Sequence, residues 1–412
     1  MQSRRWFLKS SAVAMFGTTT APAWLERALY ADDAPSPRKK VLVAILQRGA
    51  MDGLNVVIPH EEKAYYALRP TIAIPRPDGT QNSAIDLDGF FGLHPALRPL
   101  KPIYDAGHLA MIHATGSPDP SRSHFEAQDF MESGTPGLKT TGDGWLNRAL
   151  PLEKGISPLR AVGVGTELPH VLRGSNEAVA ISDLGDFQVH DTRGASAFER
   201  MYAGTHDQVL NGVGREAFDA IHHVQSAMQE TYLPEDGVRY PNGKLGQNLM
   251  QIARLIKAGL GLEVAFTDVG GWDHHVNEVG PRPTVGSLAT LLTEFGQSLA
   301  GFYRDLGDRM EDVCVVTMSE FGRTARENGA RGTDHGHANV MFAMGGKVRG
   351  GKVYGDWPGL EREQLYEQRD LNLTTDFRTV LGELVVRHLG NSDLSKVFPG
   401  FEEPKFRGLL GA

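Results

Sequence analysis

Residues 41–53 read VLVAILQRGAMDG, an apolar run followed by a polar end that contains glycine. Val41 to Leu46 shows no alternation of polar and apolar residues, which is typical of a central strand buried on both faces of a parallel sheet. The run ends in a glycine-rich turn that carries Asp52. A strand of this kind needs helices on both sides of its sheet, and the rest of the chain should supply them.

The same pattern recurs along the chain. Further strands are predicted at 108–116, 159–165, 178–182, 261–271, 312–322 and 339–346, where apolar runs end in polar or glycine-rich residues. Helices are predicted between them, at 285–306, 245–256, 193–232 and 375–389. The clearest is 285–306, where apolar residues recur at steps of three and four. This alternation predicts an α/β fold, a three-layer α/β/α sandwich with a mostly parallel central sheet, and we expect one domain over residues 39–412.

The composition narrows the class of protein. A chain of 412 residues with 41% hydrophobic content can bury a large core, and its 22% charged content is that of a globular protein. The formal net charge is -8, and no basic stripe favours a nucleic-acid partner. Cys314 is the only cysteine, and its apolar neighbours predict a buried strand residue instead of a nucleophile.

The N-terminus matches an export signal. Arg4 and Arg5 are followed by WFLK and then by a moderately apolar stretch, too short and too polar for a permanent membrane anchor. We therefore expect a removable twin-arginine signal peptide at residues 1–31 and a linker at 32–38. The expected partner is the twin-arginine export machinery, and the expected location is periplasmic or extracellular.

Side chains that commonly bind metals lie next to the predicted strands. Sheets of this kind bind ligands outside the carboxyl ends of their strands. A single aspartate there is more often a turn former or a helix cap, but several carboxylates and imidazoles together favour one or two divalent cations. Mixed oxygen and nitrogen ligands suit zinc, manganese or iron better than calcium. The residues predicted to hold metal are Asp52, Asp273, His275, Glu320, Asp334, His335 and His337.

Five motifs carry a family resemblance: RGAMDGLNVVIP, SRSHFEAQDFMESG, GGWDHH, SEFGRTARENGARGTDHG and TTDFR. With them, the chain resembles the twin-arginine-exported domain-of-unknown-function 1501 family over essentially its whole length from residue 39. That family is placed in the alkaline phosphatase and sulfatase superfamily. The resemblance implies an alkaline-phosphatase-like fold, one or two metals, and a hydroxyl or formylglycine nucleophile at a helix N-terminus. The family's own reaction is largely unassigned.

The resemblance leaves two assignments open for the stretch TDHGH. In one, Asp334 and His335 form the superfamily's Asp-His metal pair, with His337 as an outer partner. In the other, which we favour, Glu320 supplies the carboxylate and His335 takes the place of the late histidine. Both keep His335 at the metal.

The stretch GGWDHH departs from the phosphatase spacing, which leaves a second metal in doubt. Asp273 and His275 are the favoured ligand pair. His274 should point elsewhere, because successive side chains of an extended segment face opposite sides.

The segment GSPDPSRSHFE should hold the nucleophile, because a helix begins there and its first amides can bind a phosphate or sulfate. Ser121 is the favoured nucleophile and Ser123 the second choice. Ser117 is less suitable, since SPDPSR is one residue longer than the sulfatase motif. Ser123 has another interpretation, as a helix cap with Glu126 in a capping box.

Three more side chains join the predicted site. Arg122 or Arg323 would hold an anionic ester through its planar fork of donors. His124 is a metal ligand, a leaving-group acid or part of the helix scaffold. Together these features favour an exported metal-dependent hydrolase that acts on an anionic phosphate or sulfate ester. The alternative is a metal-stabilised exported binding protein that has lost catalysis, and the serines are what separate the two.

Overall fold

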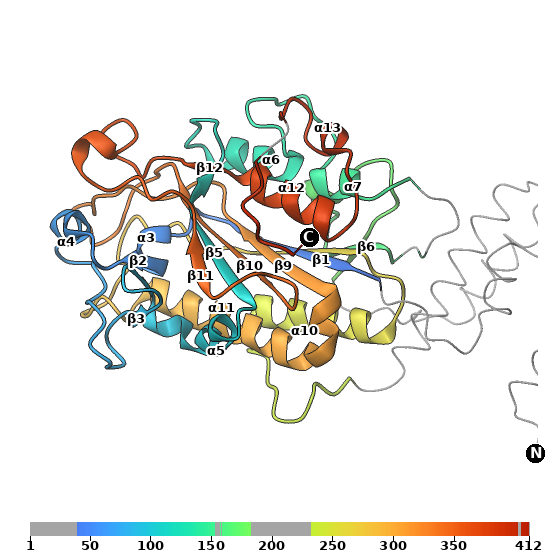
Figure 1. The fold of residues 1–412 in the computed structure, drawn as a ribbon, viewed down its shortest axis with the longest axis horizontal. Coiled ribbons are helices and arrows are strands. Elements are labelled where there is room, and N and C mark those ends of the chain that lie inside the picture. The colour runs from blue at the N-terminus through green and yellow to red at the C-terminus, as the bar shows by residue number, and fades with distance from the viewer. Residues whose placement is uncertain (1–38, 153–156, 158, 183–231, 403–404, 412) are drawn as a thin grey trace, which may run out of the picture.

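The structure, a computed structural model, describes residues 39–152, 157, 159–182, 232–402 and 405–411 (Figure 1). The predicted signal peptide and linker lie outside these residues, as does nearly all of the helix predicted over 193–232. The described chain forms a nine-stranded sheet with the order β11-β5-β10-β9-β1-β8-β6-β7, in which β12 pairs with β5. Its strands are β1 (Val41–Gln47), β5 (Leu109–Gly116), β6 (Ala161–Val164), β7 (Val179–Ile181), β8 (Val264–Val269), β9 (Val313–Met318), β10 (Asn339–Gly345), β11 (Lys352–Tyr354) and β12 (Thr375–Asp376). Every strand predicted from an apolar run is present.

The direction of one strand matters most for the site. β1 is parallel to both of its neighbours, β8 and β9, whereas β10 is antiparallel to β9 and to β5. The start of β10 therefore lies at the same edge of the sheet as the ends of β1, β5, β8 and β9. Because of this reversal, residues just before β10 can meet residues that follow the parallel strands.

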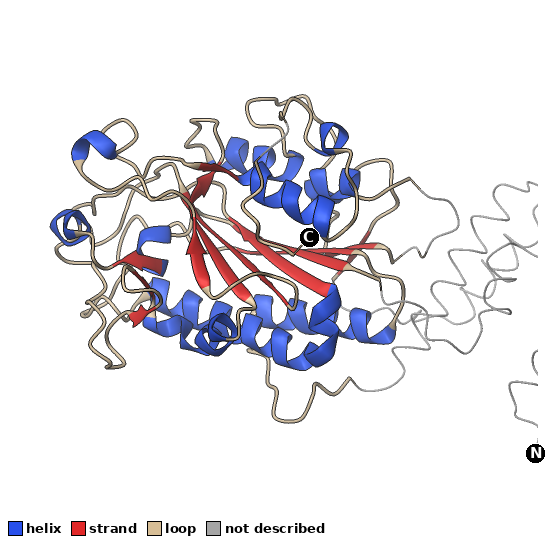
Figure 2. Ribbon diagram, viewed as in Figure 1, coloured by secondary structure: helices blue, strands red, loops and turns tan. Residues whose placement is uncertain are grey.

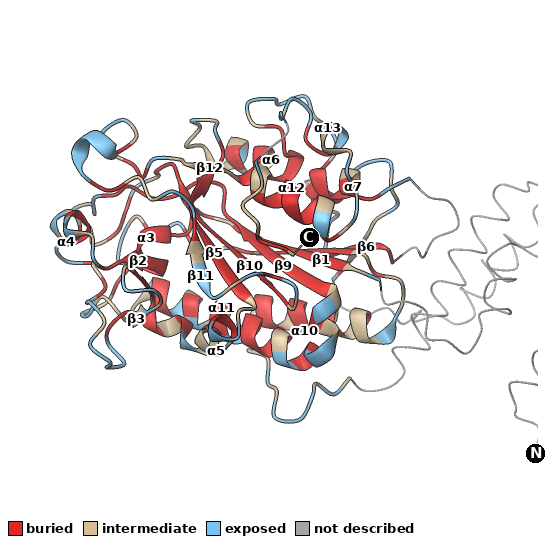
Figure 3. Ribbon diagram, viewed as in Figure 1, coloured by how far each residue is buried: buried red, intermediate tan, exposed pale blue. Residues whose placement is uncertain are grey.

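Both faces of the sheet are covered, as the apolar run of β1 requires. Val41, Val43 and Ile45 belong to one hydrophobic core, and the alternate residues Leu42 and Ala44 belong to the other. The first core is closed by η1 (Pro95–Leu100), α5 (Lys101–Asp105), α10 (Lys244–Ala258) and α11 (Ser287–Leu306). The second is closed by α6 (His124–Ser133), α7 (Trp145–Ala149), α12 (Phe377–Arg387) and α13 (Leu394–Val397). Figure 2 shows these helices on opposite sides of the sheet, and Figure 3 shows that the strands between them are buried. The predicted three-layer α/β/α architecture is confirmed.

Short elements extend beyond the carboxyl edge of the sheet. A small antiparallel sheet is made of β2 (Val57–Pro59), β3 (Ile85–Asp86) and β4 (Phe91–Leu93). It lies beside α3 (Gly53–Val56) and α4 (Lys63–Leu68), at the left of Figure 1. The remaining 3-10 turns are η2 (His170–Leu172), η3 (Gly307–Asp312) and η4 (Arg362–Gln364). The sequence pattern did not predict this sheet, because strands of two or three residues show no periodicity.

Two further expectations concern single features. Cys314 lies buried in β9, and burial raises the pKa of its thiol to about 12, which agrees with a packing role. Within the described part of the chain, no helix combines the length and apolar character needed to cross a bilayer.

Candidate metal centre

Three imidazoles and one carboxylate converge beyond the carboxyl edge of the sheet. Nε2 of His335 lies 3.0 Å from Nε2 of His124 and 2.9 Å from Nε2 of His275. Asp273 Oδ1 lies 3.2 Å from His335 Nε2 and 3.1 Å from His275 Nε2, and its Oδ2 lies 3.4 Å from His124 Nε2. Among the described residues, His124, Asp273 and His335 are the group whose ligand atoms all lie within 4.8 Å of one another. His275 adjoins this group through His335 and Asp273.

The outward-facing nitrogen of each imidazole meets an oxygen that can only accept a hydrogen bond. A proton on each Nδ1 satisfies that oxygen and, in the neutral form of the ring, leaves the lone pair of Nε2 directed inward. The three pairs are His124 with Glu320 Oε1 at 2.7 Å, His275 with Asp334 Oδ1 at 2.9 Å, and His335 with the Arg122 carbonyl oxygen at 2.9 Å.

Inward-facing lone pairs beside a carboxylate repel one another unless a cation lies among them. Four ligand atoms around a tetrahedral ion, each bonded at about 2.0–2.1 Å, are separated by roughly 3.3 Å. The observed contacts of 2.9–3.4 Å bracket that separation. Imidazole nitrogens with one carboxylate oxygen suit zinc, manganese or iron, so the residues present fit a divalent metal.

Glycines allow the segments that carry these ligands to approach closely. Gly49, in the turn after β1, has φ 117°, and a Cβ there would lie 2.7 Å from the backbone nitrogen of Asp273. Gly336, next to His335, would place a Cβ 2.3 Å from the carbonyl carbon of Arg323. A side chain at either position would push apart the loops that hold Asp273 and His335.

Glu320 lies behind His124, away from the inward-facing atoms. Its Oε1 accepts hydrogen bonds from His124, from the backbone amide of Gly49 at 2.7 Å and from Gln128 Nε2 at 2.8 Å. Burial alone raises the pKa of Glu320, but these hydrogen bonds lower it overall, so the carboxylate is ionised. The structure therefore places Glu320 as the acceptor that orients His124, whereas the sequence suggested that Glu320 itself holds metal.

Asp52 is outside the cluster, contrary to the expectation from its position after the first strand. The guanidinium of Arg69 pairs with both carboxylate oxygens, with Nη2 2.9 Å from Oδ1, and both side chains are buried. Burial would raise the pKa of Asp52, but the charge of Arg69 lowers it overall. Burial and the charge of Asp52 together raise the pKa of the neighbouring Glu278 well above its ordinary value. The charge of Asp52 is thus balanced by an arginine.

Asp334, His337 and His274 are not among the group of converging ligand atoms in the described residues. Asp334 accepts from His275 and so acts through that ring. His337 is buried and stacks on Tyr366 at a centroid distance of 4.3 Å, which corrects its predicted place among the ligands. His274 is buried.

The serines ahead of α6 differ in their hydrogen bonds. Ser121 Oγ donates to Glu126 at 2.8 Å and accepts from the backbone amide of Ser123 at 3.2 Å. Ser123 is the N-cap residue of α6, but its side chain makes no cap hydrogen bond. The predicted capping box is therefore wrong, because Glu126 turns to Ser121 and Lys139 instead.

The two candidate arginines also differ. Arg122 is held by Asp370 at 2.6 Å and by Glu367 at 2.7 Å, so its guanidinium is already paired. Arg323 donates from Nη1 to Asp273 at 2.8 Å, and its Nη2 is buried with no hydrogen-bond partner among the described residues. Arg323 is the one of these two arginines that bonds directly to a member of the cluster, Asp273.

Comparison with known proteins gives a family and several similar structures. The model of a family described as "Protein of unknown function (DUF1501)" matches residues 39–397. No curated protein matches the sequence.

The similar structures are a lipoteichoic acid synthase, LtaP, from Listeria monocytogenes, a protein in the alkaline phosphatase superfamily from Vibrio parahaemolyticus, and the sulfatase PsFucS1 from Pseudoalteromonas sp.. Their identities to this chain are 9%, 11% and 13%, and their TM-scores are 0.34, 0.35 and 0.33, respectively. The matches cover 77%, 78% and 86% of this chain, and 66%, 63% and 69% of the other chains. The matched region is thus about two thirds of each of those proteins.

Proposed function

The chain belongs to the DUF1501 family of proteins of unknown function, and we propose that it is an exported, metal-dependent hydrolase of phosphate or sulfate esters. The observation that carries the proposal is the convergence of three Nε2 atoms with Asp273. Export rests on the Arg4-Arg5 motif of the sequence.

The exposure of the cluster favours catalysis over a purely structural metal. The side chain of His275 is 41% exposed and that of Asp273 is 43% exposed. Structural metal sites are usually closed by protein ligands, whereas catalytic sites leave one side open to substrate. An ester can therefore approach the cluster from solvent.

A divalent ion held by these residues would lower the pKa of a nearby water or hydroxyl group and would offset the negative charge of the ester. The chain's own residues supply the rest of the site. His124, His275, His335 and Asp273 would hold the ion, and the guanidinium of Arg323, which donates from Nη1 to Asp273, adds positive charge behind this carboxylate. The N-terminus of α6, which begins at His124, adds favourable partial charge for an anion. The hydroxyl of Ser121 or Ser123, just before this helix, is the candidate nucleophile.

The test is a paired measurement of bound metal and ester hydrolysis. His335→Ala should lose both bound metal and turnover of aryl phosphates, aryl sulfates or phosphodiesters. The reason is that the substitution removes the ring whose Nε2 contacts His124, His275 and Asp273. His337→Ala is a matched control two residues away, and it should keep both properties. Unchanged metal content in His335→Ala would refute the site. Normal metal content with no hydrolysis of any ester would favour the non-catalytic binding protein.

A further inference from the structure

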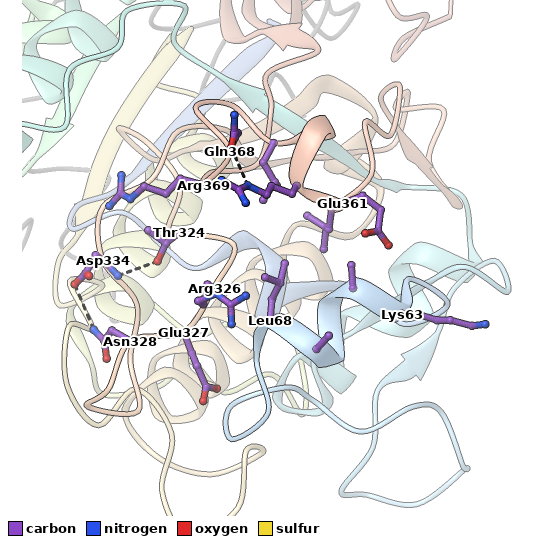
Figure 4. Close-up of a pocket in the computed structure, with 15 residues that line it drawn as sticks. Lys63, Leu68, Thr324, Arg326, Glu327, Asn328, Asp334, Glu361, Gln368 and Arg369 are labelled. Carbon is purple, nitrogen blue, oxygen red and sulfur yellow. Dashed lines mark hydrogen bonds between the residues drawn. The ribbon is translucent and has the colours of Figure 1, made fainter.

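A cavity of about 770 Å³ adjoins the metal cluster (Figure 4). It lies between α4, the loop that carries Thr324 to Asp334, and the segment from Leu360 to Arg369. Pockets of about 300–1,000 Å³ hold ligands much larger than a free phosphate or sulfate ion. The cavity therefore has room for the body of a substrate.

The cavity shares walls with the metal cluster. Asp334 lines it, and the same carboxylate accepts from His275 Nδ1 at 2.9 Å. Arg369 also lines it and donates from Nη2 to the carbonyl oxygen of His335 at 2.9 Å. A ligand in the cavity would thus be separated from His275 by Asp334 and from His335 by Arg369.

The acidic side chains of the cavity are already bonded. Glu327 accepts from the amides of Thr71 and Ile72 at 2.9 and 3.0 Å. Glu361 takes part in the capping box of η4, and Asp334 is paired with His275. These carboxylates have their lone pairs engaged by the protein's own donors.

The basic side chains retain unused donors. No hydrogen bond or ion pair joins Arg326 to another described residue, although the side chain lies within the group that lines the cavity (Figure 4). Arg362 uses only Nε, which donates to Gln368 at 2.8 Å, so its two terminal nitrogens stay available. Lys63 also lines the cavity but extends away from it (Figure 4). The unused hydrogen-bond donors of the cavity therefore belong to positively charged side chains, in a chain whose net charge is -8.

Apolar side chains complete the lining: Ala64, Ala67, Leu68, Leu360 and Leu365. The backbone of the lining is also constrained, because the consecutive residues Glu367 and Gln368 have φ of 51° and 56°. Positive φ at residues other than glycine costs free energy and persists only where the surrounding structure enforces it. The two residues set the turn that places Gln368 on Arg362 and Arg369 on His335.

We propose that this cavity binds the body of the ester substrate, and that Arg326 and Arg362 recognise a second anionic group on that body. The substrate class is then an ester with an apolar surface and an additional carboxylate, sulfate or phosphate. This inference rests on the proposed hydrolase function for the position of the reacting ester. The cavity itself, with the unused donors of Arg326 and Arg362, is independent of whether hydrolysis occurs.

The test measures binding, with phosphonates that cannot be hydrolysed. Phenylphosphonate is compared by calorimetry with 4-carboxyphenylphosphonate, 4-sulfophenylphosphonate and a longer carboxybiphenyl phosphonate, on the metal-loaded full chain. At least one compound with the second anion should bind the wild-type protein about threefold to fivefold more tightly, the gain expected from one exposed ion pair. The carboxylate and sulfonate arms show which anion is preferred, and the preference should shrink at high salt.

Arg326→Gln and Arg362→Gln should each lower the ratio of affinities, and the variant with both changes should bring it close to one. Arg239→Gln is the matched control, because Arg239 is an exposed arginine on the segment that packs on α11, and it should keep the wild-type ratio. Equal affinities for all four phosphonates in the wild-type protein would overturn the inference, even if esters are hydrolysed. A preference that depends on Arg326 without any ester hydrolysis would overturn the proposed hydrolase function and leave the binding site intact.

Discussion

Replacing Glu320 by glutamine should weaken metal binding about 10- to 100-fold. Glu320 Oε1 lies 2.7 Å from Nδ1 of His124, and the carboxylate is fully buried. It keeps the proton of the imidazole on Nδ1 and leaves the lone pair on Nε2 facing the ion. A hydrogen bond to a charged partner contributes about 1.5–3 kcal/mol, and 1.4 kcal/mol corresponds to a factor of ten in affinity. A glutamine can turn its NH2 toward His124, which favours the tautomer whose inward Nε2 carries a proton and cannot bind a metal.

The assay is a titration of the metal-free chain with zinc against a chromophoric chelator of known affinity. Glu383→Gln is the matched control, since Glu383 is equally buried and accepts from backbone amides of Gly408 and Leu410 at 3.0 and 3.2 Å. Both variants lose a buried carboxylate and should lose stability, but only Glu320→Gln should lose metal affinity. Equal zinc affinities for folded Glu320→Gln and the wild-type chain would refute the argument that Glu320 orients His124.

Other predictions test the serines, the pH dependence and the export signal. Ser121→Ala should lower the thermal unfolding midpoint at a cost of about 1 kcal/mol, because its hydroxyl accepts the amide of Ser123. Ser123→Ala should keep that midpoint, and full ester turnover in both variants would rule out a serine nucleophile. The chain should lose stability as the pH falls from about 6.5 to 4. Burial lowers the pKa of His113 to about 4, so below 6.5 the unfolded chain binds the extra proton, at a cost of up to about 3 kcal/mol. Urea unfolding of His113→Gln should show a smaller loss of unfolding free energy between pH 7 and pH 5 than the wild-type chain shows. An equal loss in the variant and the wild-type chain would contradict this assignment. Lysines in place of Arg4 and Arg5 should retain the protein in the cytoplasm, and unaltered periplasmic delivery in cell fractionation would exclude the twin-arginine route.

The sequence by itself determined that a central sheet is covered by helices on both faces. An apolar run such as Val41 to Leu46 can be stable only when both faces of the strand are covered, and amphipathic stretches such as 285–306 can cover only one face each. These are local patterns, so they are visible without knowing which strands are neighbours. The same reasoning directed attention to the carboxyl edge of the sheet, where Asp273, His275 and His335 do meet.

Only the tertiary structure decided which side chains converge on one point and which lie behind them. Spacing along the chain could not distinguish Glu320 from His124, because the choice depends on α6 placing His124 between Glu320 and His335. Nor could it reveal that Arg69 balances Asp52, since an arginine 17 residues away gives no local signal of the pairing.

The reversal of β10 was equally invisible in the sequence, because a strand buried on both faces reads the same in either direction. That reversal brings His335 to the edge where the parallel strands end. A binding site requires side chains to point toward one position, and their orientations are fixed by packing between segments far apart in the chain.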